Sequence, residues 1–250
     1  MAQASELTLC GLPAVQARFA RDPGSIKRLF FDEPTSRKLG PMCKALAAAR
    51  KIYRCVSPDE LEKISGTVHH GGVVCVVSAP ALGAPLAKDI AAWAAARTPL
   101  LVLDRIGNPH NLGAIARSAA FFGVSNIIIP THPAAALPGE SAYRVSEGGL
   151  EHIKVWRVPS LPVFLGALAG SGYEVLGAAA RGGAPGPRHP AAKPIALVLG
   201  NEEHGLAPEV AKACTGLVTL AGSGKVESLN VSVAAAVLLH TLIGNKFASA

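Results

Sequence analysis

The stretch PLLVLDRIGNPHNLGAIARSAAFFGVSNIIIP (residues 99–130) decides the fold of this 250-residue chain. Within it, residues 100–106 predict a buried strand, residues 112–122 a helix, and residues 126–129 a second strand. Two strands joined through a helix run parallel, and helices cover the faces of the sheet that such strands form. The stretch therefore predicts an α/β architecture built on a parallel sheet.

The same alternation continues toward the C-terminus. Further strands are expected at 153–158, 173–178, 195–199 and 217–220, and further helices at 141–149, 161–168 and 230–247. The last of these helices is apolar nearly all round, so we expect it to be buried in a domain or subunit interface.

The N-terminal part of the chain predicts a separate, smaller α/β domain at residues 1–78. Short strands are expected at 52–56 and 73–77, and a helix begins at Ser57, which is followed by Pro, Asp and Glu. Residues 79–98 combine a Pro-, Gly- and Ala-rich linker with a connecting helix. Residues 99–250 then form the second domain.

The net charge of +7 is concentrated in one place. Residues 18–54 hold ten Lys or Arg against three acidic residues, which accounts for the whole excess of positive charge. A basic face favours a polyanionic partner, and phosphate backbones are the commonest of these. A metabolic enzyme with a small substrate would fit the α/β pattern but would not need this stretch.

Several other classes of protein are disfavoured. The five cysteines are odd in number and form no C-x-x-C pair, so we expect free thiols in a reducing cytoplasm. No apolar run approaches the roughly 20 residues of a membrane span. His69, His70 and Cys75 fit no common zinc pattern, so no metal is expected. The Gly222-Ser-Gly-Lys segment lacks the hydroxyl residue of a phosphate-binding loop, because Val226 stands in its place.

Polar residues after the first strand form the first candidate site. We expect Asn111 to cap the helix and Gly113 to admit a ligand or another backbone closely. Arg117 is four residues further on, so it shares a side of the helix with Gly113 and points toward the crevice at the carboxyl edge of the sheet. Taken alone, a plain cap and a solvated arginine explain these residues equally well.

Two further segments carry polar residues beside buried strands. In PIALVLGNEEHGLAP (residues 194–208), a strand runs into Gly200, Asn201 and Glu202, where paired glycines frame an acidic loop. In LVTLAGSGKVESLNVSVAAAVLLH (residues 217–240), Ser228 and Asn230 precede the last helix. They could cap it or hold a ligand.

Taken in order, NxGAIxR, GxExxGL and SLNVSVA resemble the three motifs of the SpoU/TrmH branch of the SPOUT RNA methyltransferases. The resemblance covers residues 99–248. The N-terminal region, with GLPAV at 11–15 and HHGGVV at 69–74, resembles the small RNA substrate-binding domain that often precedes this catalytic domain. The resemblance implies a trefoil knot in the parallel-sheet domain, a homodimer through that domain, and methyl transfer from S-adenosyl-L-methionine to a ribose 2′-hydroxyl of RNA.

Residue roles follow from the same resemblance. The matching cofactor-binding residues are Gly200, Asn201, Leu220, Ala221, Ser228, Leu229 and Asn230, and the matching catalytic residues are Asn111, Arg117, Glu202, Ser228 and Asn230. A guanidinium loses its proton only above about pH 12, so we expect Arg117 to act through its charge on the adjacent phosphate and hydroxyl. The segment SEGGLEH (residues 146–152) departs from the usual S-x-G-A pattern, and Gly149 should weaken the helix there.

The N-terminal domain favours 23S rRNA over tRNA as the substrate. A housekeeping role and a self-protecting role in antibiotic resistance are both compatible with the sequence. The rival from another class is a catalytically inactive RNA-binding or ribosome-assembly protein on the same fold, which could have lost Asn111, Arg117 or Asn230; all three are present.

Overall fold

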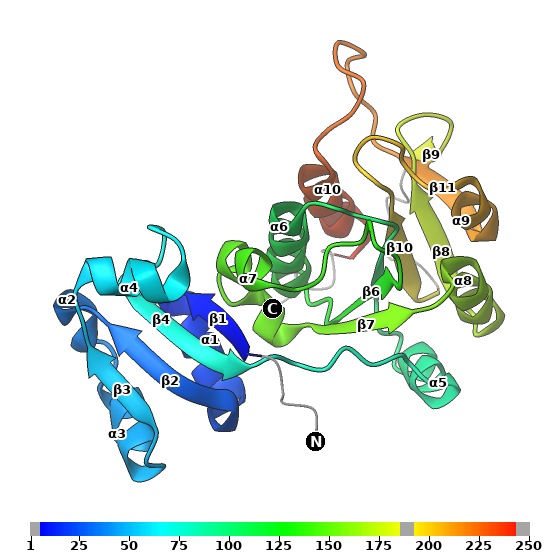
Figure 1. Ribbon diagram of the computed structural model, residues 1–250. Helices are drawn as coiled ribbons and strands as arrows, with labels where there is room; N and C mark the ends of the chain where they lie inside the picture. Colours follow the sequence, from blue (N-terminus) through cyan, green and yellow to red (C-terminus); the bar gives the residue numbers. More distant parts are fainter. Residues whose placement is uncertain (1–5, 186–192, 244–250) are drawn as a thin grey trace.

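The computed structural model describes residues 6–185 and 193–243 and contains two separate β-sheets (Figure 1). Strands of the first sheet come from residues 6–78 and those of the second from residues 100–219. The division of the chain into domains at residues 78 and 98 stays a prediction, as does the knot. Within the described ranges, no helix is long and apolar enough to cross a membrane.

The first sheet has the strand order β1-β4-β2-β3. Its strands are β1 (Glu6–Cys10), β2 (Ile26–Phe31), β3 (Ile52–Cys55) and β4 (Val73–Ser78). β4 runs antiparallel to β1 and β2, whereas β3 lies parallel to β2 at the edge. The sequence of β4, VVCVVS, is buried at its first five positions because apolar side chains pack against both of its faces. The helices are α1 (Leu12–Arg21), α2 (Glu33–Ser36), α3 (Gly40–Ala48) and α4 (Pro58–Ser65).

The second sheet is parallel throughout, as the alternation of strands and helices predicts, with the order β7-β6-β5-β10-β8-β11-β9. Its strands are β5 (Leu100–Leu103), β6 (Asn126–Pro130), β7 (Lys154–Val158), β8 (Glu174–Ala178), β9 (Ala184–Pro185), β10 (Ile195–Leu199) and β11 (Gly216–Thr219). β10 enters the sheet between β5 and β8, which brings the C-terminal motifs beside the first one.

Helices cover both faces of this sheet. They are α5 (Ala87–Ala95), α6 (Pro109–Phe121), α7 (Glu140–Ser146), α8 (Leu161–Gly170), α9 (Pro208–Ala213) and α10 (Val231–Leu242). Along β5, Leu101 and Leu103 pack with α6, α7 and α10, whereas Leu100 and Val102 pack with α5, α8 and α9. This alternation explains why the strand is apolar at every position.

The helix that follows β5, α6, begins earlier than its sequence pattern predicts. β5 ends at Leu103, and α6 begins at Pro109, a residue suited to the first turn. The Asn108 side chain caps the helix by accepting a hydrogen bond from His110 N at 2.8 Å. The prediction that Asn111 is the cap is therefore wrong: Asn111 lies inside the first turn, and its side chain is free for other contacts.

The structure also revises the ends of two predicted helices and contains one helix that was not predicted. The helix expected at 141–149 ends at Ser146, because Glu147 and Gly148 adopt left-handed backbone conformations; a short 3-10 helix, η2 (Gly149–His152), follows. The last helix ends at Leu242, and the part of the prediction beyond 243 lies outside the described residues. Sequence periodicity did not reveal α9, which is six residues long.

Candidate functional site

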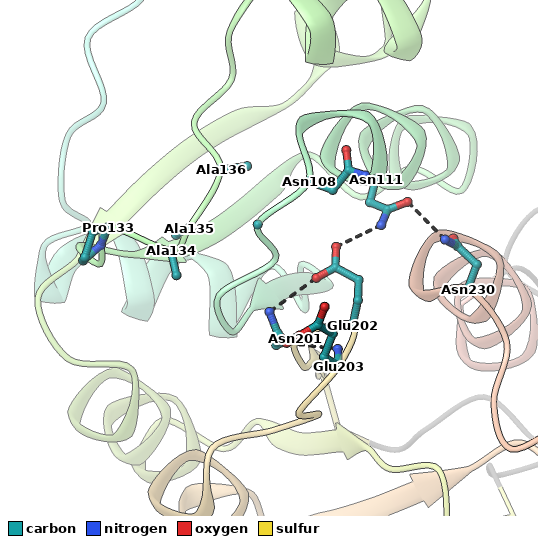
Figure 2. A pocket seen from close by; sticks show the side chains of 11 residues that line it. Asn108, Asn111, Pro133, Ala134, Ala135, Ala136, Asn201, Glu202, Glu203 and Asn230 are labelled. Carbon is teal, nitrogen blue, oxygen red and sulfur yellow. Dashed lines mark hydrogen bonds between the residues drawn. The ribbon is translucent and has the colours of Figure 1, made fainter.

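A cavity of about 730 Å³ lies at the carboxyl edge of the parallel sheet (Figure 2). Its walls come from the segments that follow β5, β6 and β10 and from the start of α10. The lining residues are Gly107, Asn108, Asn111, Pro133–Ala136, Asn201, Glu202, Glu203 and Asn230. Open α/β sheets bind ligands at this edge, where the loops after adjacent strands diverge.

Three of the predicted residues meet in one hydrogen-bonded chain. Asn111 Nδ2 donates to Glu202 Oε1 at 2.9 Å, and Asn230 Nδ2 donates to Asn111 Oδ1 at 3.3 Å (Figure 2). Asn230 Oδ1 in turn accepts from Ser232 N at 2.9 Å, so the same side chain caps α10. The three motifs are therefore joined side chain to side chain, and each of the two asparagines fixes the rotamer of its neighbour.

Asn201 holds the acidic loop in place. Its Nδ2 donates to the main-chain oxygen of Arg105 at 2.9 Å, while its Oδ1 accepts from the main-chain nitrogens of Glu203 and His204 at 3.0 and 3.1 Å. Nδ2 also lies 3.4 Å from a carboxylate oxygen of Glu202. Asn201 thus lines the cavity and also orders the loop that presents Glu202.

Gly200 permits this loop to close. Asn201 and Gly205 exchange two main-chain hydrogen bonds of 2.9 Å, and a Cβ added at Gly200 would lie 2.2 Å from the main-chain carbon of Gly205. No side chain fits there. Any contact of Gly200 with a ligand would have to come from its main chain, because the space above its Cα is filled by the loop itself.

Asp104 was not among the sequence candidates. It is 2% exposed and directly follows β5, where its carboxylate accepts from Ala207 N at 2.7 Å and from Arg105 Nε at 2.8 Å. Because the main-chain oxygen of Arg105 also binds Asn201, Asp104 ties the end of β5 to the second motif. An acidic residue directly after an apolar strand was the signal in the sequence that could have identified it.

Four predicted cofactor residues lie between β11 and α10: Leu220, Ala221, Ser228 and Leu229. Leu220 packs partly against the core, whereas residues 221–230 are all exposed and project from the sheet (Figure 1). Within the described parts of the chain, the main chain from 221 to 229 makes a single hydrogen bond, from Lys225 N to Ser223 Oγ. Unpaired N–H and C=O groups beside the half-exposed Leu229 suit a ligand that has both polar and apolar parts.

Arg117 does not line the cavity, contrary to the expectation. Its side chain is 57% exposed and its Nη2 lies 3.0 Å from Glu147 Oε2. It is six positions after Asn111 along α6, which places the two side chains about 120° apart around the helix axis. Gly113, on the same side as Arg117, faces a backbone rather than the cavity: a Cβ there would lie 2.6 Å from the Ala142 oxygen of α7.

The polar side chains that line the cavity are amides and carboxylates. No three potential metal ligands cluster anywhere in residues 6–185 and 193–243. Burial, reinforced by the charge of Asp104, raises the pKa of the Cys214 thiol to about 11, so this thiol is protonated at neutral pH. The arrangement is suited to orienting a ligand through hydrogen bonds, and offers no thiolate for covalent catalysis.

Comparisons with known proteins cover most of the chain. A family model described as the SpoU rRNA Methylase family matches residues 98–240, and one described as RNA 2'-O ribose methyltransferase substrate binding matches residues 8–82. An uncharacterized tRNA/rRNA methyltransferase of Escherichia coli O157:H7 is 35% identical over 238 residues, which are 95% of this chain and 68% of that protein.

Another relative is the 23S rRNA (guanosine-2'-O-)-methyltransferase RlmB of Nitrosomonas europaea. It is 32% identical over 231 residues, which are 92% of this chain and 88% of that protein. Among solved structures, the SpoU methyltransferase AviRb of Streptomyces viridochromogenes, in complex with its cofactor AdoMet, superposes with a TM-score of 0.73. At 24% identity over 98% of this chain and 92% of that one, this likeness shows a shared fold.

Proposed function

Because the chain belongs to the SpoU rRNA methylase family, we propose that it transfers a methyl group from S-adenosyl-L-methionine to a ribose 2′-hydroxyl of structured RNA. The observation that carries the proposal is the chain of hydrogen bonds from Glu202 through Asn111 to Asn230. It joins all three motifs at one cavity, as a reaction between two bound substrates requires.

A 23S rRNA substrate is favoured over tRNA. The relative named for 23S rRNA covers both the N-terminal sheet and the parallel sheet of this chain. Such a substrate would place the protein in the bacterial cytoplasm, where the five free cysteines would stay reduced.

The cofactor would bind across the ends of β10 and β11. The residues proposed to hold it are Gly200, Asn201, Leu220, Ala221, Ser228, Leu229 and Asn230. When bound, S-adenosyl-L-methionine supplies an electrophilic methyl group on a positively charged sulfur. The largely unpaired main chain of 221–229 would offer donors and acceptors to its polar groups, and the acidic loop would offer carboxylates to its positive charge.

Asn111, Glu202, Ser228 and Asn230 are proposed to orient the reacting ribose. Their amide, carboxylate and hydroxyl groups match the hydrogen-bonding groups of a ribose, and the bonds among Asn111, Glu202 and Asn230 limit the motion of these three side chains. Arg117 is proposed to lower the pKa of the 2′-hydroxyl through its positive charge and to hold the neighbouring phosphate. In the described structure Arg117 lies outside the cavity and pairs with Glu147, so its side chain must release Glu147 and turn toward the bound ribose to hold the phosphate.

The basic N-terminal stretch is proposed to bind the RNA through part of its charge. Arg18 is buried, Lys27 and Arg28 pair with Glu6, and Lys51 donates to main-chain oxygens. Five other side chains on or beside α2, α3 and β3 are exposed and make no hydrogen bond or ion pair within the described residues: Arg37, Lys38, Lys44, Arg50 and Arg54. We call these five residues the α3–β3 surface.

An exposed aromatic side chain lies on the same edge strand as Arg54, on the opposite face of the sheet. Tyr53 is 40% exposed on the edge strand β3, directly before Arg54. Cations that hold phosphates, together with a ring on which a base can stack, are the usual elements of single-stranded RNA binding. The α3–β3 surface therefore offers cations to the phosphates of an RNA, and the Tyr53 ring at the edge of the sheet is available to an unpaired base.

A homodimer through the parallel-sheet unit is part of the proposal. Phe121 at the end of α6 is 81% exposed, and Val233 and Val237 on one side of α10 are 48% and 41% exposed. The two helices pack together, and Phe122 meets His240 at a ring separation of 5.9 Å. Exposed apolar side chains on adjacent helices are typical of a subunit interface. Sedimentation of Val237→Asp should show a monomer where the unchanged chain sediments as a dimer.

The enzymatic proposal is tested by separating binding from transfer. Calorimetry should show binding of S-adenosyl-L-methionine, and incubation with unmethylated ribosomal RNA should transfer its labelled methyl group. The rival, an inactive RNA-binding protein on this fold, predicts RNA binding without transfer. The observation that favours the inactive alternative is that Arg117 lies outside the cavity.

A further inference from the structure

The segment SEGGLEH (residues 146–152), which we call the joint, contacts both the N-terminal sheet unit and Arg117. It begins at the last residue of α7 and continues through η2. Figure 1 shows α7 beside β1 and α1, and direct contacts between these elements hold the two parts of the molecule together. The cofactor and substrate motifs do not include the joint.

A buried ion pair fastens the joint to the N-terminal unit. Arg18 Nε, on α1, donates to Glu151 Oε1 at 2.9 Å, and the two residues are 5% and 2% exposed. Arg18 Nη2 also lies 3.4 Å from the hydroxyl of Tyr143, which is 3% exposed. Burial raises the pKa of Glu151, and the Arg18 guanidinium opposes that rise. Buried charges of this kind contribute little net stability, but their directed hydrogen bonds favour one relative orientation of the parts they join.

The two glycines of the joint face opposite neighbours. Gly148 has φ = 90°, and a Cβ added there would lie 3.0 Å from the Cβ of Ala17 and 3.1 Å from the main-chain oxygen of Pro13, both on α1. A Cβ added at Gly149 would lie 2.9 Å from the Cα of Arg117. Consecutive residues therefore touch the N-terminal unit and the arginine, with no side chain between.

Glu147 completes the connection. Its carboxylate pairs with Arg117 at 3.0 Å, and its φ of 45° is a left-handed conformation that residues other than glycine seldom adopt. The surrounding contacts of Gly148 and Glu151 hold it in that conformation. A change in the orientation of α1 relative to the parallel sheet would therefore displace Glu147, the ion-pair partner of Arg117.

We propose that Arg18 and Glu151 are positioning residues that fix the N-terminal unit relative to Arg117. The proposal rests on the proposed function: RNA held on the α3–β3 surface would be presented to Arg117 at one set angle. Neither residue touches the cavity, so the effect on the reaction passes through the joint.

The double variant Arg18→Met, Glu151→Leu tests this in the full-length chain. It replaces the pair by apolar side chains of similar size and leaves no buried charge unpaired. We expect binding of S-adenosyl-L-methionine and RNA to stay within about twofold of the unchanged chain. The rate of methyl transfer at saturating RNA should fall about 10- to 100-fold, as displacements near 1 Å at a reacting centre produce. Small-angle X-ray scattering should show a wider range of inter-unit distances.

Glu6→Gln is the matched control, because it breaks ion pairs within the N-terminal unit only. It should leave both the transfer rate and the scattering unchanged. Should the double variant fail to fold, Gly148→Ala, which places a methyl group against α1, makes the same comparison. An unchanged transfer rate with unchanged scattering would overturn the proposal. If the unchanged chain transfers no methyl group, the proposed function fails, and the scattering alone still decides whether the pair fixes the orientation.

Discussion

The two sides of α6 have different neighbours. On one side Asn111 faces the cavity and is held by Glu202 and Asn230, two residues from later motifs. On the other side Arg117 faces the joint and is held by Glu147, which adjoins the N-terminal unit. One motif, NxGAIxR, therefore has two sets of contacts: its first residue lines the cavity, and its last contacts the joint, which adjoins the unit that we propose to bind RNA.

Removal of the Arg117 guanidinium should have the largest effect. Arg117→Ala should lower the rate of methyl transfer by about 10²–10³-fold, as loss of a charge that stabilises a developing oxyanion does. Binding of S-adenosyl-L-methionine should be unchanged, because Arg117 lies outside the cavity. Transfer rates and calorimetry on the same preparation check both. Near-normal methylation would show that Arg117 has no catalytic role.

A change at Asn111, on the cavity side of α6, should lower the rate of methyl transfer less than the change at Arg117. It should also weaken binding of the ligand in the cavity. Asn111→Ala removes the hydrogen bond to the Glu202 carboxylate, and such bonds contribute about 1.5–3 kcal/mol. We expect kcat/KM to fall about 10- to 100-fold. Ser118→Ala, which removes a hydroxyl bonded only to the Ala114 oxygen within α6, is the control for helix stability. Equal losses in both variants would contradict a specific role for Asn111.

The sequence predicted the cavity side better than the joint side. Strand order could not be read from periodicity, but the resemblance assigned Asn201 and Asn230 to one site, and the structure places both at the cavity. The error at Asn111 arose because two asparagines lie three residues apart, and only Pro109 distinguishes the cap from the first turn.

The structural role of the joint could not be predicted from the sequence, because it depends on contacts with α1, which lies more than 120 residues earlier in the chain. Gly149 was expected to weaken a helix; in the structure it admits the backbone of Arg117. Arg18 was counted with the surface charge, yet its partner Glu151 lies 133 residues away. A count of charges in the sequence does not distinguish paired basic side chains from unpaired ones. Of the basic stretch, we therefore propose only the α3–β3 surface for RNA binding.

The α3–β3 surface should affect RNA binding without affecting the cavity. Changing Lys38, Lys44 and Arg50 to Gln should weaken RNA binding and lower the slope of log Kd against log salt by about 2 to 3, roughly one for each phosphate that is no longer neutralised. Lys63, Lys88 and Lys212 changed to Gln remove the same charge from positions elsewhere on the chain and serve as the control. Equal slopes in the two triple variants would mean that the RNA lies on another face.

The smallest expected effect concerns the packing of the first sheet, in which both Cys10 and Cys75 lie. Burial raises the pKa of Cys75 to about 12 and that of Cys10 to about 11, so both thiols keep their protons in the folded state. Their contribution to stability is complete below the unfolded value of about 8.5 and is lost as pH rises above it. At pH 8 the exposed Cys55 should react first with a thiol reagent. Fast reaction of Cys75 would show that the first sheet is not packed as described.

The measurement that bears most directly on the central claim is methyl transfer to ribosomal RNA from a strain that lacks this protein. The full-length chain and Arg117→Ala would each be incubated with this RNA and S-adenosyl-L-methionine labelled in the methyl group, and the RNA then hydrolysed in alkali. We expect an alkali-resistant dinucleotide carrying the label with the unchanged chain, and about 10²–10³-fold less of it in the same time with the variant. Label on a base, or RNA and cofactor bound with no label transferred, would contradict it.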